Sequence, residues 1–321
     1  MGWLRRTPKM TPREVDRSHV LVGREGWLFW AGRKRGVLDY YRPRLRNALR
    51  VRRWARLFSE RERRCRELGG RFIQVIAPDK LSIYPDKIEG HVIHGERGFA
   101  GTLARRSPCV LDLVGPLTRA RTDGETLLKT DTHWTHAGYL TAYRTLCAAM
   151  GVEPASHILG AAVAEPTPCV FDLGGKFDPP IVEMMGEVRL ERRAERVEAN
   201  VLLRHQEALE LSGFVPGMMV GSRAVFRNGS PGVDPRTLVV FGDSYVFHRT
   251  GLGAMLAESF AETHLIWSAA MDWTYLERLR PDLVLNETAE RFARTRPKDG
   301  IDVDALAAQR VREAEAKIAA A

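Results

Sequence analysis

Apolar residues follow two different periods along this chain, and these periods predict alternating helices and strands. From 44 to 68 they recur at helical spacing, which predicts a helix. The continuous apolar run 71–77 that follows predicts a buried strand. The same patterns predict further strands at 110–113, 238–241, 264–267 and 282–285, and further helices at 137–150, 252–260 and 271–279. Alternating strands and helices are typical of an α/β protein with a parallel sheet.

The periodic pattern weakens between about 153 and 235, where glycines and prolines are frequent and apolar runs are short. We therefore expect one α/β domain over 21–300, interrupted by a small β-rich insertion at 153–235. A loose basic arm is expected at 1–20, and an Ala-rich C-terminal helix at 301–321.

Composition and charge narrow the class of protein and its partners. The chain has 321 residues, of which 44% are hydrophobic and 28% charged, as in ordinary globular proteins. A formal net charge of +9 favours anionic partners, such as an acidic polysaccharide. No nucleic-acid-binding motif accompanies the charge, so no nucleic-acid partner is expected. The four cysteines lack the spacing of a zinc site. No apolar run has the length of a signal peptide or a membrane span, which taken alone predicts a cytoplasmic protein.

The tripeptide Gly242-Asp243-Ser244 directly follows the predicted strand 238–241. A serine on a tight turn between a strand and a helix lies at the carboxyl end of the sheet, where open α/β folds bind ligands. We predict Ser244 as a nucleophile, with its own backbone N–H stabilising the oxyanion.

A base for this serine is expected in the segment Asp131-Thr132-His133-Trp134. Imidazole takes up and returns a proton near neutral pH, which makes His133 the predicted general base. In extended backbone, positions i and i+2 point to the same side, so Asp131 is predicted to orient the imidazole. Trp134 is expected to pack on the His133 ring or to form the pocket wall.

The same segment supports a second interpretation, in which a metal ion is bound. Asp131, His133 and His136 have the spacing Asp-x-His-x-x-His, and both residue types are good ligands for zinc or iron. Against this interpretation, no further ligand cluster is evident in the sequence, and His136 equally suits the start of a helix.

Other residues are candidates for contacts with the substrate or the oxyanion. Lys80 and Tyr84 follow a predicted strand on the ligand side of the sheet, and Tyr245 follows the predicted nucleophile. The candidates for a second oxyanion donor are Gly251, Gly253 and Asn286.

These motifs together resemble the alginate O-acetyltransferase family of SGNH-hydrolase-like proteins, the AlgJ and AlgX type. The landmarks are, in order, Gly23-Arg24-Glu25-Gly26-Trp27-Leu28-Phe29, Ala77-Pro78-Asp79-Lys80, Ile83-Tyr84-Pro85, Asp131-Thr132-His133-Trp134, Gly242-Asp243-Ser244, Pro281-Asp282-Leu283-Val284 and Glu290-Arg291. The acid and base precede the nucleophile, as in this branch and unlike the common SGNH order. The resemblance implies a flavodoxin-like three-layer α/β fold and a triad of Asp131, His133 and Ser244.

The resemblance also implies a function. We expect a serine-dependent O-acetyltransferase or acetylesterase that acts on hydroxyl groups of a polysaccharide, without a cofactor. It implies an acyl donor delivered by a membrane-bound acyltransferase, and a periplasmic or other extracytoplasmic location. Two alternatives remain open at this point: a non-catalytic glycan-binding or assembly component of a polysaccharide biosynthesis system, and the metal-dependent hydrolase described above.

Overall fold

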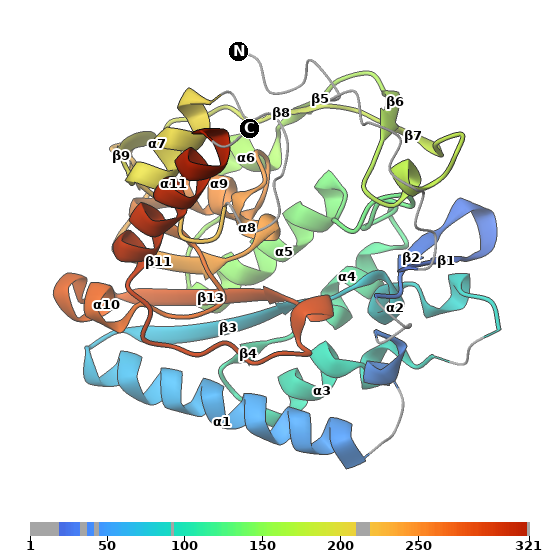
Figure 1. Cartoon of the computed structure of the whole chain (residues 1–321), viewed down its shortest axis with the longest axis horizontal. Helices are drawn as coiled ribbons and strands as arrows, with labels where there is room; N and C mark the ends of the chain where they lie inside the picture. Colours follow the sequence, from blue (N-terminus) through green and yellow to red (C-terminus); the bar gives the residue numbers. More distant parts are fainter. Residues whose placement is uncertain (1–18, 33–36, 42–44, 91–92, 210–218, 320–321) are drawn as a thin grey trace.

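A seven-stranded mixed sheet runs through the centre of the protein (Figure 1). Its strands, in spatial order, are β4 (Val110–Leu111), β3 (Arg71–Ala77), β13 (Leu283–Ala289), β11 (Asp234–Gly242), β12 (Phe260–Trp267), β10 (Arg223–Arg227) and β9 (Glu195–Ala199). The first five strands are parallel, and β10 runs antiparallel to both of its neighbours. The carboxyl ends of the parallel strands therefore meet along one edge of the sheet, where the candidate site lies.

The computed structural model describes residues 19–32, 37–41, 45–90, 93–209 and 219–319. The predicted basic arm, 1–20, lies almost entirely outside the described residues.

Helices cover both faces of the sheet and make the three layers expected for this fold class (Figure 1). Helices α1 (Leu45–Glu67) and α3 (Phe99–Arg106) pack on one face, and α5 (His136–Met150) and α9 (Leu252–Ala257) on the other. The remaining helices are α2 (Lys80–Ile83), α4 (Val114–Ala120), α6 (Ser156–Leu159), α7 (Val201–Ala208), α8 (Ser244–Phe247), α10 (Trp273–Leu279) and α11 (Val303–Ala319). Short 3₁₀ helices are found at Arg24–Gly26, Leu38–Tyr41, Pro85–Lys87, Gly95–Arg97, Gly174–Lys176 and Glu290–Phe292.

The helix and strand limits follow the sequence signals closely in the best-patterned parts. Helix α1 and strand β3 span nearly the predicted ranges. Helix α5 begins after Thr135, whose side chain accepts a hydrogen bond from the backbone N–H of Gly138. The helix ends before Gly151, which adopts the left-handed conformation that glycine favours after a helix, with a φ of 70°. Helix α9 is shorter than predicted, because Phe260 already begins strand β12.

The segment predicted as a β-rich insertion, 153–235, does contain short strands, but only part of it lies outside the main sheet. It forms two small sheets outside the main one, β5 (Ala162–Val163) with β8 (Val188–Arg189), and β6 (Thr167–Val170) with β7 (Val182–Met185). The same segment also supplies β9 and β10, which extend the main sheet. Strand β9 is an exposed, charged edge strand, so it lacks the apolar run by which a buried strand is recognised.

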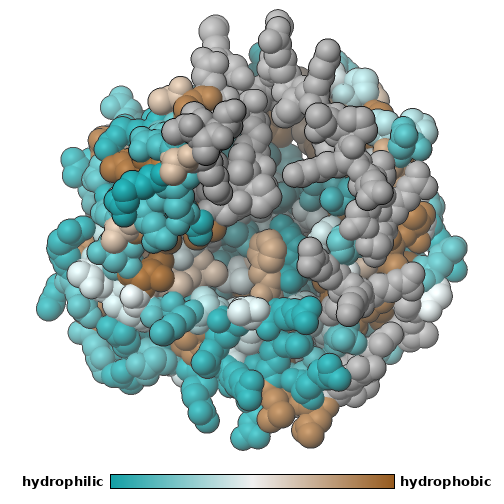
Figure 2. All heavy atoms as spheres, in the orientation of Figure 1, coloured by the Kyte–Doolittle hydropathy of each residue, from teal (hydrophilic) through white to brown (hydrophobic). Residues whose placement is uncertain are grey.

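Within the described residues, no helix is long and apolar enough to cross a bilayer. Among the coloured residues of the face seen in Figure 2, hydrophilic ones predominate, and the apolar ones are scattered in small groups. The two-stranded hairpin of β1 (Val20–Val22) and β2 (Leu28–Trp30) packs beside the carboxyl edge of the sheet.

Candidate active site

Strand β11 ends in a tight turn that presents Ser244 as the first residue of α8. Gly242 is required there, since a Cβ atom would lie 2.3 Å from the Val246 side chain. Asp243 caps the short helix by accepting a hydrogen bond from the Tyr245 N–H through Oδ1, at 3.1 Å. This geometry fixes the position of the half-buried Ser244 at the carboxyl edge of the sheet.

Two residues of the neighbouring strand β13 form hydrogen bonds with Asp243 in the same turn. Asp243 Oδ2 accepts a hydrogen bond from the Ala289 N–H at 3.0 Å, and Glu287 Oε2 accepts one from the Asp243 N–H at 3.0 Å. Burial, reinforced by the nearby Asp243 carboxylate, raises the pKa of Glu287 well above its usual value. The turn is therefore anchored to a buried side chain of β13, the strand that pairs with β11.

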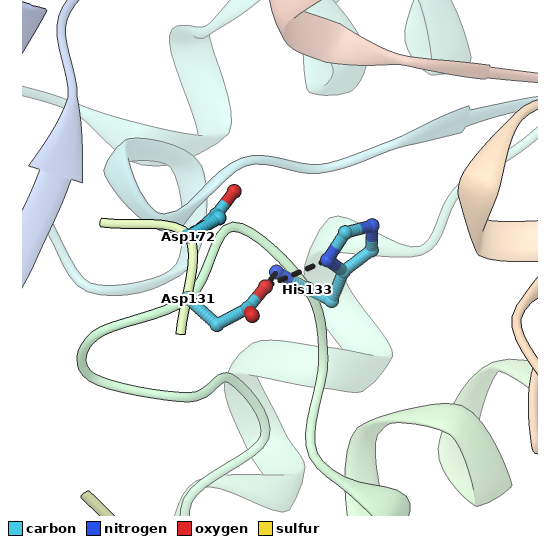
Figure 3. A group of neighbouring side chains, drawn as sticks. All are labelled: Asp131, His133 and Asp172. Carbon is cyan, nitrogen blue, oxygen red and sulfur yellow. Dashed lines mark hydrogen bonds and ion pairs between the residues drawn. The ribbon is translucent and has the colours of Figure 1, made fainter. Parts of the chain in front are cut away.

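His133 reaches this turn from the segment that precedes α5. Its Nε2 lies 2.7 Å from Ser244 Oγ, and its Nδ1 lies 2.6 Å from Asp131 Oδ1. The same carboxylate oxygen accepts a hydrogen bond from the His133 backbone N–H at 2.8 Å. Figure 3 shows the Asp131 carboxylate facing Nδ1 while the other ring nitrogen points away from it. The structure thus brings an alcohol, an imidazole and a carboxylate into one hydrogen-bonded line.

The charge state of the acid suits a partnership with histidine. Burial alone would raise the pKa of Asp131, but hydrogen bonds and charge attraction from His133 lower it to about 2. Asp131 is therefore a carboxylate at neutral pH. A carboxylate on Nδ1 keeps the proton on that nitrogen and leaves Nε2 as an acceptor for the serine proton.

Two aromatic side chains pack beside the His133 ring, Tyr245 directly and Trp134 against Tyr245. The Tyr245 ring lies 5.1 Å from the His133 ring, and Trp134 packs on Tyr245 at 4.6 Å between ring centroids. The buried Tyr245 hydroxyl donates a hydrogen bond to the Thr132 carbonyl at 2.6 Å. Trp134 thus forms the wall behind Tyr245, and Tyr245 fixes the segment between the acid and the base.

Two residues expected to contact substrate are instead used inside the protein. Lys80 is 4% exposed, and its Nζ donates to the carbonyls of Leu28 and Lys129, each at 2.6 Å. Tyr84 is buried, stacks on Trp27 at 4.0 Å and accepts a hydrogen bond from a backbone N–H through its hydroxyl. Their place after β3 is as predicted, but long-range partners that sequence does not reveal occupy their polar atoms.

The three candidates for a second oxyanion donor are likewise engaged or distant. The Gly251 N–H donates to the His248 carbonyl at 2.8 Å. Gly253 lies inside α9, where a Cβ would meet the Leu265 side chain at 2.7 Å. Asn286 is fully buried and joins Arg61 through its Oδ1 at 2.9 Å. Ser244 differs, because its backbone N–H has no hydrogen-bond acceptor among the described residues.

The third ligand predicted for a metal site, His136, does not lie with Asp131 and His133 in the structure. Among the described residues, the cluster around Asp131 and His133 is completed by Asp172, and His136 is not part of it. His136 is the first residue of α5, which begins after the Thr135 cap. A carboxylate oxygen of Asp172 lies within 4.8 Å of the ligand atoms of both others, and the two Asp172 oxygens already accept hydrogen bonds from Thr132.

Sequence reasoning assigned no role to three residues beside the triad: Asp172, Glu183 and His248. The ring of His248 lies 6.2 Å from the His133 ring. Its Nδ1 lies 3.4 Å from the Thr250 N–H nitrogen and 3.2 Å from the Thr250 hydroxyl oxygen. Burial and the nearby His133 lower the pKa of His248 to about 4, so the ring is neutral at physiological pH. Its position four residues after Ser244 was the only signal available.

Comparison with known proteins identifies the class to which this fold belongs. A family model described as the SGNH hydrolase-like domain of acetyltransferase AlgX matches residues 20–168. The fold resembles the O-acetyltransferase domain of Pseudomonas putida AlgJ, with a TM-score of 0.57 and 17% identity over 91% of this chain and 98% of that one. It also resembles Bacillus cereus PatB1, with a TM-score of 0.62 and 14% identity over 85% and 95% of the two chains. The protein has an SGNH-hydrolase-like fold.

Sequence relatives narrow the class further. The chain is 31% identical over 105 residues to a probable alginate O-acetylase AlgJ of Pseudomonas syringae pv. tomato, covering 31% of this chain and 24% of that protein. It is 28% identical over 136 residues to the corresponding protein of Pseudomonas aeruginosa, covering 40% and 32%. The matches thus span about a quarter to a third of these relatives' own lengths. With the family model, they show that part of the chain is similar to proteins of the AlgJ/AlgX type, in agreement with the resemblance of its motifs.

Proposed function

We propose that this protein is a serine-dependent O-acetyltransferase, or acetylesterase, that acts on hydroxyl groups of a polysaccharide. The observation that carries the proposal is the line of hydrogen bonds from Ser244 through His133 to Asp131, at 2.7 and 2.6 Å. The names of the relatives, alginate O-acetylases, support a polysaccharide acceptor and acetyl transfer. The net charge of +9 is compatible with an acidic acceptor such as alginate.

The first half of the reaction makes an acyl-enzyme. His133 Nε2 takes the proton of Ser244 Oγ while this oxygen attacks the acyl carbonyl. The negative charge on the carbonyl oxygen is stabilised by the Ser244 backbone N–H, the donor without an acceptor among the described residues. When the tetrahedral intermediate collapses, His133 returns the proton to the leaving group, and the acyl group stays on Ser244.

The second half transfers the acyl group. A sugar hydroxyl gives its proton to His133 and attacks the acyl-enzyme, which forms the new ester and restores Ser244. Water in place of the sugar would give net hydrolysis. Both outcomes use the same triad, and the protein's partners decide between them. We propose that a membrane-bound acyltransferase supplies the acyl group outside the cytoplasm, as the family resemblance implies.

A chromogenic acetyl ester tests the proposal directly. Ser244→Ala should lower turnover to the uncatalysed rate, whereas Ser156→Ala, at an exposed serine that begins α6, should retain parental turnover. A serine-directed fluorophosphonate should label the parent and not Ser244→Ala. Activity of Ser244→Ala that a chelator abolishes would replace the proposal with a metal hydrolase. Absence of both labelling and turnover in the folded parent would indicate a glycan-binding component instead.

A further inference from the structure

The small sheet of β6 and β7 lies against the segment that carries the acid and the base. Its two strands are antiparallel and stand outside the main sheet, as a projecting ribbon in Figure 1. We call β6, β7 and the connection between them, residues 167–185, the ribbon. The segment 129–133 beside it has no regular secondary structure, so its conformation depends on contacts from elsewhere in the chain.

Glu183, on β7, binds the start of that segment. Its Oε1 accepts a hydrogen bond from the Lys129 N–H at 2.8 Å. Its Oε2 accepts two more, from the Thr130 N–H at 2.8 Å and the Thr130 hydroxyl at 2.7 Å. One carboxylate thus fixes two successive residues immediately before Asp131. Hydrogen bonds to an ionised acceptor are stronger than neutral ones.

Asp172, just after β6, binds the residue between the acid and the base. Its Oδ1 accepts a hydrogen bond from the Thr132 N–H at 2.9 Å, and its Oδ2 accepts one from the Thr132 hydroxyl at 2.6 Å. Figure 3 shows the Asp172 side chain beside Asp131 and His133. The ligand atoms of these three residues lie within 4.8 Å of one another, so Asp172 also places a second carboxyl group near the imidazole.

Backbone contacts join the ribbon to the same segment. The N–H groups of Leu173 and Gly174 both donate to the Thr130 carbonyl at 3.0 Å. Gly174 permits this approach, because a Cβ atom there would lie 2.3 Å from the Ile181 carbonyl oxygen and 3.3 Å from the Thr130 side chain. The ribbon and the segment 129–133 are therefore bonded through both side chains and backbone.

We propose that Glu183 and Asp172 are positioning residues that hold the segment 129–133 so that His133 reaches Ser244. The inference rests on the proposed function, and it adds which residues hold His133 in line with Ser244. A displacement of about 1 Å in a catalytic group costs on the order of 10²-fold in rate. The five hydrogen bonds that the two carboxylates accept from this irregular segment therefore matter. Asp172 additionally stabilises the imidazolium that forms when His133 accepts the serine proton.

The test compares Glu183→Gln and Asp172→Asn with Glu191→Gln, a change in an exposed ion pair with Arg193. Each amide keeps the size of the side chain but removes the charge and one acceptor. We expect kcat on a chromogenic acetyl ester to fall about tenfold in each of the first two variants and about a hundredfold in the double variant, with KM within about twofold. The rate of fluorophosphonate labelling should fall in parallel, and Glu191→Gln should match the parent.

A pH–rate profile separates positioning from simple loss of folding. The titratable groups that face the His133 ring are Asp131, Asp172, Tyr245 and His248, with Arg291 behind Tyr245. Removing the Asp172 carboxyl group should move the acid limb of the profile to lower pH, because an imidazolium would lose a nearby carboxyl group. Glu183→Gln should leave the limb in place, since its bonds go to Lys129 and Thr130.

Thr132 supplies an independent check. Thr132→Ser keeps the hydroxyl that binds Asp172 and should retain parental kcat, whereas Thr132→Val removes it and should lose several-fold. The inference is overturned if both carboxylate variants keep parental kcat and labelling rates, or if their losses equal the loss of folded protein without any shift of the acid limb. Failure of the proposed function is distinguishable, since Ser244→Ala would then be as active as the parent.

Discussion

Replacing Asp131 with asparagine tests how much the carboxylate contributes. In the parent, a single oxygen accepts hydrogen bonds from the His133 ring and from its backbone N–H, at 2.6 and 2.8 Å. Asparagine keeps the shape but removes the charge, and its amide nitrogen can face the ring. In that arrangement the ring proton moves to Nε2, which then no longer accepts the proton of Ser244.

The expected losses of stability and of kcat in Asp131→Asn follow from the surroundings of the Asp131 carboxylate. The pKa of Asp131 is lowered to about 2, about two units below that of an unfolded aspartate, which corresponds to about 2–3 kcal/mol at neutral pH. Because the folded pKa is the lower one, this contribution is present above about pH 4 and is lost as the pH falls through about 2. For catalysis, losing the charge and the tautomer should cost about 10³–10⁴-fold in kcat, or about 4–5.5 kcal/mol.

Two assays measure these effects on the same variant. Initial rates on a chromogenic acetyl ester give kcat and KM, and we expect the loss to fall on kcat. Urea unfolding at pH 7 and at acid pH gives the stability, with Asp131→Asn about 2 kcal/mol less stable at pH 7 and equal to the parent near pH 2. Asp123→Asn, at an exposed aspartate a few residues upstream, is the matched control and should resemble the parent in both assays.

A variant Asp131→Asn that retained more than about a tenth of the parental kcat would refute this reasoning. So would a stability difference that stayed constant between pH 7 and pH 2, because it would assign the effect to packing and not to the charge.

Three further predictions follow from the same contacts. Lys80→Met leaves the carbonyls of Leu28 and Lys129 without their donor and should lower the free energy of unfolding by about 2–4 kcal/mol in a urea titration. Tyr245→Phe removes the hydrogen bond to Thr132 and should cost about 1–2 kcal/mol of stability and several-fold in kcat, measured by unfolding and ester hydrolysis; an unchanged kcat would show that this contact does not orient the base. Incubation with a chelator should leave ester turnover unchanged. A loss of turnover after chelation would contradict a mechanism that works without a metal ion.

The sequence predicts the main sheet and most of its helices because these elements have long, regular apolar patterns. Strand β3 and helix α5 are recovered almost to the residue, and the turn at Ser244 is recognised from the abrupt end of β11. The acid and the base are found for a similar reason: residues i and i+2 in extended backbone face the same way. These inferences depend on neighbours in sequence.

The sequence does not predict features that depend on partners distant in the chain. Lys80 looks like a surface lysine, and only the fold reveals the two carbonyls that it binds. Asn286 lies in a strand near the site, yet its amide belongs to a buried network with Arg61. Asp172 and Glu183 come from a segment rich in glycine and proline, where no period indicates which carboxylate faces the catalytic segment.

The most direct test of the account is to find where an acyl group is attached during turnover. The protein is mixed with an activated acetyl ester, quenched in acid before the intermediate is consumed, digested and analysed by mass spectrometry. We expect the mass of one acetyl group on the peptide that contains Ser244, and none on that peptide in Ser244→Ala. Acetylation of another residue together with full turnover by Ser244→Ala would contradict the central claim.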